Sequence, residues 1–517
     1  MHAAVGLDIG TTNVKAVLVG ADGDTVTTSQ RTLKTERHGT DAEQDASALW
    51  SAVVDAVAEL SAAEPEVAAA VGAIGVCSQY SSIVPVNAAA EPVGPMVMWS
   101  DHRGTDHSWD IMGRDDDAFL TWIDRHGIPT VGGGLALAHI LHLQKDRPEL
   151  LDATAAWLEP MDFVTARLTG RITATQHSMF MSQLCDNRTL GVTNYDDELI
   201  SLAGVDATRL PPLIDIDEPV GTLMPSIAES LGLPADAIVY AGSNDTAAGG
   251  VATGVTRPGR AGLAIGTTSV LIDTVAEKNT DLDHEILSMP ALDHDRYLVF
   301  AENGYGGRVV EYVLHEIVHA DDSLADHTSA APFARLDDAL VESEAGAGGA
   351  LFLPWLGGSL APSAAPGMRG GFINVSLSSS RVDLVRAVTE GVAHNLAWLL
   401  PHVEAFTGAA IEEVAFVGGA ARSREWSQVL ADVLGRTVVP AVQPDTAVAR
   451  SVARLALARR GGLDRAEVES GVELGERFEP DANKRPMYEH HQTQFEAAYA
   501  ALRPISEALT NFHGDAQ

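Results

Sequence analysis

The sequence predicts an α/β protein in which two related lobes flank a central cleft. Apolar strand patterns alternate with helical patterns along the chain, which is typical of the α/β class. Residues 6–14 read GLDIGTTNV and residues 262–270 read GLAIGTTSV, which match at seven of nine positions with an offset of 256. Coincidence in a Gly- and Ala-rich chain is one explanation, but a duplicated unit with equivalent turns explains the match better.

The length and the order of the patterns indicate how the lobes divide the chain. At 517 residues the chain is too long for one ordinary core. The Gly-rich stretch GGVATGVTRPGRAG marks a boundary near residues 250–260, so we expect domains at 1–254 and 255–517. The first unit is predicted as strands Val5–Ile9, Val14–Val19 and Thr25–Thr28, a helix over Asp45–Leu60 and a strand at Ala73–Cys77. Residues 344–371 are expected to be irregular, and a closing helix is expected from about residue 486.

The composition argues against several kinds of partner. Acidic side chains number 71 against 34 basic ones, for a formal net charge of −37, which disfavours nucleic acids and anionic membranes. A salty habitat or the Ala-rich, Lys-poor usage of a high-GC genome would each explain this acidity. Cys77 and Cys185 lack metal-ligand spacing and favour a reducing interior. Neither a secretory signal nor a run of about 18 apolar residues is visible, so we expect a cytoplasmic protein.

Two Gly-Thr turns are candidate phosphate sites. In the first, Gly10 permits close backbone approach, and the amides and hydroxyls of the threonines can donate to phosphate oxygens. Asp8 ends the preceding strand and is placed to hold hydrated Mg²⁺. Each turn alone could be an ordinary hairpin, but two turns opposed across a cleft could grip one polyphosphate. The first turn comprises Asp8, Gly10, Thr11, Thr12 and Lys15, and the second comprises Gly266, Thr267, Thr268 and Ser269.

A Gly pair in the second half is a candidate nucleoside site. Gly418 and Gly419 follow the apolar strand Val414–Val417, and Ser423 precedes a helical pattern that contains Trp426. A strand, a Gly pair and a helix N-terminus let a flat nucleoside or a phosphate approach the backbone, although a Gly pair that serves packing is an equal alternative. No Walker A sequence is present, so the P-loop route to ATP is excluded.

Asp245 is the candidate catalytic base, and a second motif suits a polyhydroxylated ligand. Asp245 follows the apolar strand Ala237–Ala241 and begins a segment of small residues, so its carboxylate could accept the proton of an attacking hydroxyl. An Asp N-cap is the alternative. Trp99, Asp101 and Arg103 combine a stacking surface with charged hydrogen-bonding groups. A surface ion pair beside a partly buried Trp is the alternative there.

Taken together, these motifs resemble the FGGY family of carbohydrate kinases from residue 1 to about 503, in particular its xylulose-kinase and gluconate-kinase branch. The resemblance implies two actin-like (ribonuclease H-like) domains, with ATP and sugar in the cleft and Mg²⁺ as cofactor. It assigns both Gly-Thr turns to phosphate, Gly418, Gly419 and Ser423 to the nucleoside, and the role of base to Asp245. The expected sugar-side residues are Gln79, Tyr80, Ser81, Trp99, Asp101, Arg103, Asn244 and Asp245.

The chain departs from the family pattern at three places. Ser81 stands where xylulose kinases usually carry an imidazole that helps to define the sugar pocket, which puts xylulose itself in doubt. Thr175–Ser178 stands where relatives have an Asp-rich turn. Arg450 stands in a segment that is small-residue Gly-Ala-Ala in relatives, and there it contacts the nucleotide or points into solvent.

We therefore expect in-line transfer of the γ-phosphoryl group of ATP to a hydroxyl of a small, xylulose-like ketose. Gluconate, a polyol or glycerol as acceptor is one alternative, and a non-catalytic actin-fold sensor of sugar or nucleotide is another. The expected partners are a small sugar and ATP, with no nucleic acid and no membrane. A homodimer is one option for the assembly, which the sequence does not fix.

Overall fold

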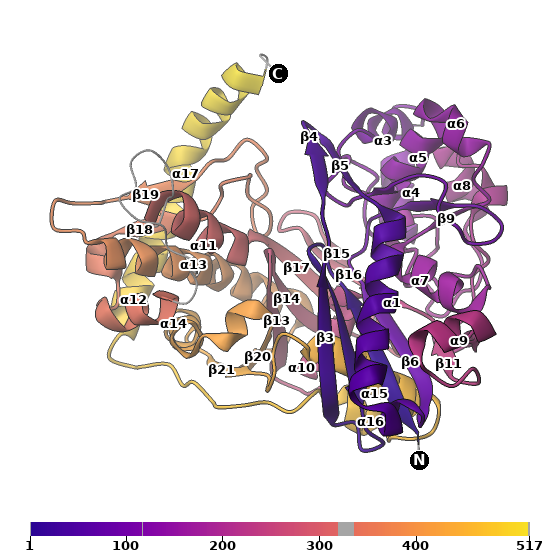
Figure 1. Cartoon of the computed structure of the whole chain (residues 1–517). Coiled ribbons are helices and arrows are strands. Elements are labelled where there is room, and N and C mark those ends of the chain that lie inside the picture. Colours follow the sequence, from indigo (N-terminus) through magenta and orange to yellow (C-terminus); the bar gives the residue numbers. More distant parts are fainter. Residues whose placement is uncertain (1, 116, 319–334, 515–517) are drawn as a thin grey trace.

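The computed structural model describes residues 2–115, 117–318 and 335–514, and it forms two lobes side by side, each around a sheet (Figure 1). The strands of the first sheet are β1 (Ala3–Ile9), β2 (Asn13–Val19), β3 (Thr25–Thr32), β6 (Val71–Ser78), β10 (Pro219–Thr222), β11 (Ile238–Tyr240) and β12 (Ser243–Asn244). Their order is β3-β2-β1-β6-β11-β10, and β12 also pairs with β6. β1, β2 and β3 are successively antiparallel, whereas β6 runs parallel to β1 and β11 parallel to β6.

The second sheet repeats this arrangement. Its strands are β13 (Arg260–Ile265), β14 (Thr268–Val275), β15 (Thr280–Asp281), β16 (Ile286–Pro290), β17 (Tyr297–Tyr305), β20 (Glu413–Val417) and β21 (Thr437–Pro440). The path β17-β14-β13-β20-β21 has the same directions as β3-β2-β1-β6-β11, with two antiparallel pairs followed by two parallel pairs. The repeated nonapeptide therefore spans equivalent central strands, and the prediction of an α/β protein with two related lobes is confirmed.

Helices cover the outer face of each sheet. In the first lobe α1 (Ala46–Ala63) packs against β2 and β3, and in the second α13 (Arg381–Thr407) and α14 (Arg424–Leu434) lie over the sheet (Figure 1). Among the described residues, α1 is the one helix whose length and composition would allow it to cross a membrane. Its apolar stripe of Leu49, Val53, Val57 and Leu60 is buried in the core of the lobe, so the helix serves that core.

At the centre of the molecule, each half of the chain contributes one helix that packs against the sheet of the other half. α10 (Asp245–Thr253) packs against the second sheet, whereas α15 (Ala447–Arg459) packs against the first sheet and against α10. Gly6 makes room for α15, because a Cβ there would lie 2.0 Å from the carbonyl oxygen of Ala449. Gly262 is the equivalent residue of the repeat, and a Cβ there would lie 2.4 Å from the hydroxyl of Thr253. The expected boundary between 254 and 255 stays a prediction, and the packing crosses it.

A helical insertion between β6 and β10 was not predicted from the sequence. Its core gathers around the buried Trp122 and Trp157, and it places the segments that reach the cleft from the first lobe. The insertion and its surroundings contain β7 (Val84–Val86), β8 (Met96–Val97), α3 (Thr105–Met112), α4 (Ala118–Arg125), α5 (Ala136–Asp146), α6 (Pro148–Leu151), β9 (Ala156–Leu158), α7 (Pro160–Thr169) and α8 (Asp197–Ala203).

The remaining elements agree with the predicted pattern, with additions. The predicted first unit is present, with a short hairpin inserted before α1 and a short helix after it. The stretch 344–371 is largely irregular. The closing helix packs against α13 and α14, and its C-terminal end projects from the second lobe (Figure 1). These elements are β4 (Glu36–His38), β5 (Asp41–Gln44), α2 (Pro65–Ala68), α9 (Pro225–Leu231), α11 (Gly307–Val313), α12 (Leu336–Glu342), β18 (Leu351–Leu353), β19 (Gly371–Ile373), α16 (Arg465–Glu469) and α17 (Arg485–Gly514).

Candidate active site

Both Gly-Thr turns and Asp245 line a single cleft between the lobes. The cleft is partly open to solvent and measures about 1470 Å³ when this open space is included. The predicted site residues that line it are Asp8, Gly10, Thr11, Thr12, Lys15, Gln79, Tyr80, Ser81, Trp99, Asp245, Gly266, Thr267, Thr268 and Gly418. Residues from opposite halves of the chain therefore face the same space, as a site that grips one ligand from two sides requires.

In both turns the glycine amide donates to a carbonyl further along the same turn, but the two closures differ by one residue. The Gly10 amide donates to the carbonyl of Asn13 at 2.9 Å, and the Gly266 amide donates to the carbonyl of Thr268 at 3.0 Å. A Cβ on Gly266 would meet no atom within 4 Å. A side chain at that position would therefore occupy only the cleft, so the glycine keeps the backbone open to a ligand.

Three carboxyl groups gather in the cleft. Burial raises the pKa of Asp245 to about 7, with the negative charges of Asp8 and then Glu302 as further causes. Burial also raises the pKa of Asp8 and that of Glu302. Lys15 Nζ lies 4.0 Å from Asp8 Oδ2. Because oxygen ligands and unbalanced negative charge suit a hard divalent cation, these side chains fit Mg²⁺.

Glu302 was not predicted as a site residue. It lies on β17 and lines the cleft beside Phe300. The available signal was a carboxyl group directly after the apolar run Leu298–Ala301, because an acidic residue in a buried strand needs a reason.

Hydrogen bonds tie the sugar-side residues to the first turn. Thr11 Oγ1 donates to Gln79 Oε1 at 2.9 Å, and Trp99 Nε1 donates to Thr11 Oγ1 at 3.2 Å. Ser81 has a φ of 60°, and its hydroxyl donates to the carbonyl of Gly134 at 2.7 Å. The wall of the cleft thus joins the first turn to the loop that precedes α5.

Glu159 supports this wall from behind and was also not predicted. The amides of Ser81 and Ser82 donate to its two carboxylate oxygens at 3.1 and 3.0 Å. Glu159 is fully buried, and burial raises its pKa. The two amide bonds fix the backbone at Ser81, where a left-handed conformation is otherwise unfavourable for a residue with a side chain.

Comparison with known proteins identifies the family. The model of the FGGY family of carbohydrate kinases, N-terminal domain, matches residues 3–252, and the corresponding C-terminal domain model matches residues 261–459. The chain belongs to the FGGY family of carbohydrate kinases. It is therefore a phosphotransferase with an alcohol group as acceptor, and the predicted family, fold and enzyme class are confirmed.

Individual relatives are similar to the kinase over nearly its full length. It is 25% identical to a xylulose kinase of Staphylococcus epidermidis over 516 residues, and this alignment covers 98% of each chain. It is 23% identical over 437 residues to a gluconokinase of Bacillus subtilis, covering 84% of this chain and 83% of the relative. Its fold is similar to a xylulose kinase of Rhodospirillum rubrum, with a TM-score of 0.81, 26% identity, and coverage of 98% of this chain and 100% of that one.

Asp101 and Arg103 lie behind the wall of the cleft in this kinase. Asp101 is fully buried and accepts from the Ala42 amide at 2.8 Å and from Arg103 Nη2 at 2.7 Å. Arg103 also donates to Glu43 at 2.6 Å. Neither residue lines the cleft, so the geometry does not support direct sugar contact, which stays an untested expectation. Their ion pair instead anchors the loop that carries Trp99.

Asn244, Gly419 and Ser423 also serve the framework and do not line the cleft. Asn244 is the N-cap of α10, and its Oδ1 accepts from the Ala247 amide at 2.8 Å. The alternative that Asp245 is itself the N-cap is therefore wrong. Gly419 begins a 3₁₀ turn, and Ser423 caps α14 while contacting Asp337. The structure gives these three residues supporting roles, and the expected ligand contacts at these positions stay predictions.

The departures at 175–178 and at Arg450 now have structural explanations. His177 Nδ1 lies 2.8 Å from the carbonyl of Pro290, and its Nε2 accepts from the Asn244 amide at 3.4 Å. Burial lowers its pKa to about 4, so the ring is neutral and bridges the lobes beside Asp245. Arg450 is buried and donates to the Val442 carbonyl at 2.7 Å. It does not point into solvent, and it does not line the cleft.

Proposed function

We propose that this kinase transfers the γ-phosphoryl group of Mg-ATP to a hydroxyl of a xylulose-like ketose. The proposal depends on one observation: Asp245 shares a cleft with both Gly-Thr turns. Amides and hydroxyls at Thr11, Thr12 and Thr267 are the donors that we assign to the phosphoryl oxygens, whose negative charge develops in the transition state.

Asp245 is the group that we assign as general base. With a pKa of about 7, its carboxyl is partly ionised near neutral pH, where a base of matched strength is most effective. It would take the proton of the attacking hydroxyl as the new P–O bond forms. Closure of the two lobes around the ligands would exclude water and limit loss of ATP by hydrolysis.

Asp8 is the residue that we assign to hydrated Mg²⁺, with Glu302 as a further carboxyl in the same cleft. When bound, the ion neutralises charge on the phosphate oxygens. Burial is the main cause of the raised pKa of both carboxyls. A cation that replaced their lost hydration would stabilise the charged forms, and this supports the assignment.

The charge of the cleft favours a neutral sugar over gluconate. Among the described residues that line it, Lys15 is the only Lys or Arg side chain, and it lies 4.0 Å from Asp8. An acceptor with a carboxylate would therefore meet three protein carboxyl groups without a free cation to pair with. Similarity to xylulose kinases points the same way, whereas Ser81 in place of the usual imidazole leaves related ketoses and polyols as candidates.

A panel of acceptors would test the proposal. ADP release would be followed with xylulose, ribulose, xylitol, glycerol and gluconate, each with Mg-ATP. We expect the highest kcat/KM with a ketose and the lowest with gluconate. A preference for gluconate would contradict the charge argument. ATP binding without ADP release for any acceptor would favour a sensor of sugar or nucleotide.

We further propose that the kinase acts in the cytoplasm on small molecules alone. Its acidic charge disfavours nucleic acid and anionic membrane surfaces, and the buried Cys77 and Cys185 are unpaired, which agrees with a reducing compartment. The homodimer stays an option, and the molecular mass in solution would decide it.

A further inference from the structure

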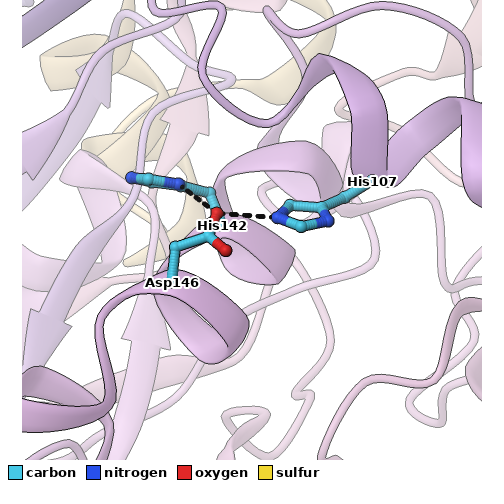
Figure 2. Close-up of side chains that lie close together, drawn as sticks. All are labelled: His107, His142 and Asp146. Atoms are coloured by element: carbon cyan, nitrogen blue, oxygen red, sulfur yellow. Dashed lines mark hydrogen bonds and ion pairs between the residues drawn. The ribbon is translucent and has the colours of Figure 1, made fainter.

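Two histidines and an aspartate meet in the helical insertion, away from the cleft. His107 comes from α3, and His142 and Asp146 come from α5 (Figure 2). His107 Nε2 lies 2.7 Å from Asp146 Oδ2, and His142 Nδ1 lies 2.8 Å from the same oxygen. From these side chains we propose a binding site for a divalent transition metal such as Zn²⁺.

The local sequence explains why these groups converge. His142 and Asp146 are separated by one helical turn, so their side chains share a face of α5. α3 lies close beside α5 because Gly104 permits it: a Cβ there would lie 2.3 Å from the carbonyl oxygen of Ala138. As a result, the ligand atoms of all three side chains lie within 4.8 Å of one another.

The donor set selects the kind of ion. Two imidazole nitrogens and one carboxylate oxygen are ligands that Zn²⁺ and its neighbours accept, with a fourth position left to water, whereas Mg²⁺ and Ca²⁺ prefer oxygen alone. Around a tetrahedral ion at metal–ligand distances of about 2.0–2.2 Å, ligand atoms lie roughly 3.4 Å apart. Each imidazole nitrogen, now 2.7 or 2.8 Å from Asp146 Oδ2, must therefore move roughly 0.6 Å away from that oxygen. The side chain of Asp146 is 43% exposed and ends α5, so it has room to move.

The simpler alternative is a hydrogen-bonded triad with no ion. In that arrangement both imidazoles donate to one carboxylate oxygen, and the Nε2 of the buried His142 remains without a partner among the described residues. An ion on Nδ1 would leave this Nε2 without a partner as well, so the unpaired atom does not decide between the two arrangements. The proposal depends on the convergence of the three ligand atoms. An ion on Nδ1 would fix the tautomer and orientation of that ring.

A bound ion would clamp α3 to α5. α3 follows the loop of Trp99, and α5 follows Gly134, and both of these residues line the cleft. The clamp would thus steady the wall on the acceptor side. This consequence depends on the proposed function, whereas the metal site itself does not.

Zinc titration of the full-length protein would test the site. Chelator-treated wild type, Asp146→Asn and His107→Gln would compete with a chromogenic chelator for Zn²⁺ in the absence of ATP. We expect one tight zinc site in the wild type. Each variant should lose affinity for zinc by at least about 100-fold, because removing a metal ligand should cost no less than removing a residue that hydrogen-bonds to a ligand. Zinc should also raise the Tm of the wild type but not that of Asp146→Asn.

Two controls separate this site from other zinc-binding groups. Asp8→Asn removes a carboxyl of the cleft. His294→Gln removes the imidazole of a second cluster of possible ligands, where it lies 3.3 Å from Asp215 and 3.7 Å from Asp217. Both controls should retain the tight site. Wild-type affinity in Asp146→Asn, or no saturable binding by the wild type, would overturn the proposal. If His107→Gln fails to fold, the exposed Asp146 variant still decides. Because activity is not the readout, failure of the kinase proposal would leave this result unaffected.

Discussion

Replacing Asp245 by Asn should lower turnover and at the same time stabilise the protein. The substitution keeps the shape of the side chain but removes the proton acceptor. We expect kcat to fall by roughly 10²–10⁴, the range for loss of a general base, with ATP binding nearly unchanged. Coupled ADP release and equilibrium nucleotide binding would measure the two quantities separately.

The stability change follows from the pKa of the buried carboxyl. The folded-state pKa is raised from 3.8 to about 7, so the folded protein holds this proton more tightly than the unfolded chain. Below pH 3.8 the carboxyl is protonated in both states and costs the folded protein no stability. Between pH 3.8 and about 7 the unfolded chain ionises first, so the free energy of unfolding falls as pH rises, and it stops falling above about pH 7. A shift of this size corresponds to about 4 kcal/mol at most, because each pKa unit is worth 1.36 kcal/mol and the carboxyl is partly open to the cleft.

Asp273→Asn is the matched control for this prediction. Burial also raises the pKa of Asp273, to about 6, but the residue lies on β14 and does not line the cleft. Both variants should gain more stability over wild type at pH 8 than at pH 5, and only Asp245→Asn should lose turnover. Loss of less than tenfold in kcat would remove Asp245 from its role. A stability gain that is equal at the two pH values would refute the electrostatic account.

Three further variants probe the repeat and the cleft. Gly6→Ala should destabilise the protein by about 3 kcal/mol through overpacking, since its Cβ would lie 2.0 Å from the Ala449 carbonyl oxygen; a denaturant midpoint equal to wild type would contradict this. Gly266→Ala should leave stability unchanged, because its Cβ meets no atom within 4 Å, yet raise the KM for ATP, and an unchanged KM would argue against ligand contact there. Glu302→Gln should move the acid limb of the pH profile of kcat/KM to lower pH, because the Glu302 charge helps to raise the pKa of Asp245. That shift should be small, since burial and Asp8 contribute more, and a shift to higher pH would refute it.

The fold was largely predictable because its two central strands carry their own signal. β1 is buried on both faces, and its sequence is an apolar run. The repeat of this sequence at β13 predicted a second lobe of the same topology. The packing of α10 and α15 on the sheets is also visible in the sequence. Gly6, Gly75 and Gly262 stand inside strands, where glycine weakens a sheet, because a Cβ there would collide with one of these helices. The helical insertion had no such repeat. Its helices form against one another around Trp122, and that packing is not visible in local patterns.

The candidate site was most directly predictable where the backbone itself forms the feature. A Gly-Thr turn after a buried strand has few alternatives, so both turns were found at the cleft. Asp101 and Arg103 could not be assigned in the same way, because a ligand-binding pair and a buried structural pair have the same sequence. Only the amide of Ala42, 59 residues away, and the carboxylate of Glu43 show that the charges are already satisfied.

The charge of the cleft explains why phosphate binding should depend on backbone groups and a cation. A chain with a formal net charge of −37 offers no general attraction to ATP, and Lys15 is the only Lys or Arg side chain among the described residues of the cleft. Asp8, Asp245 and Glu302 would repel a free triphosphate. The same carboxyls would attract the divalent cation of a metal-bound triphosphate, so we expect this arrangement to favour Mg-ATP over free ATP. In the proposed site, amides at Thr11 and Thr267 would supply the donors that lysine and arginine provide in other phosphate sites.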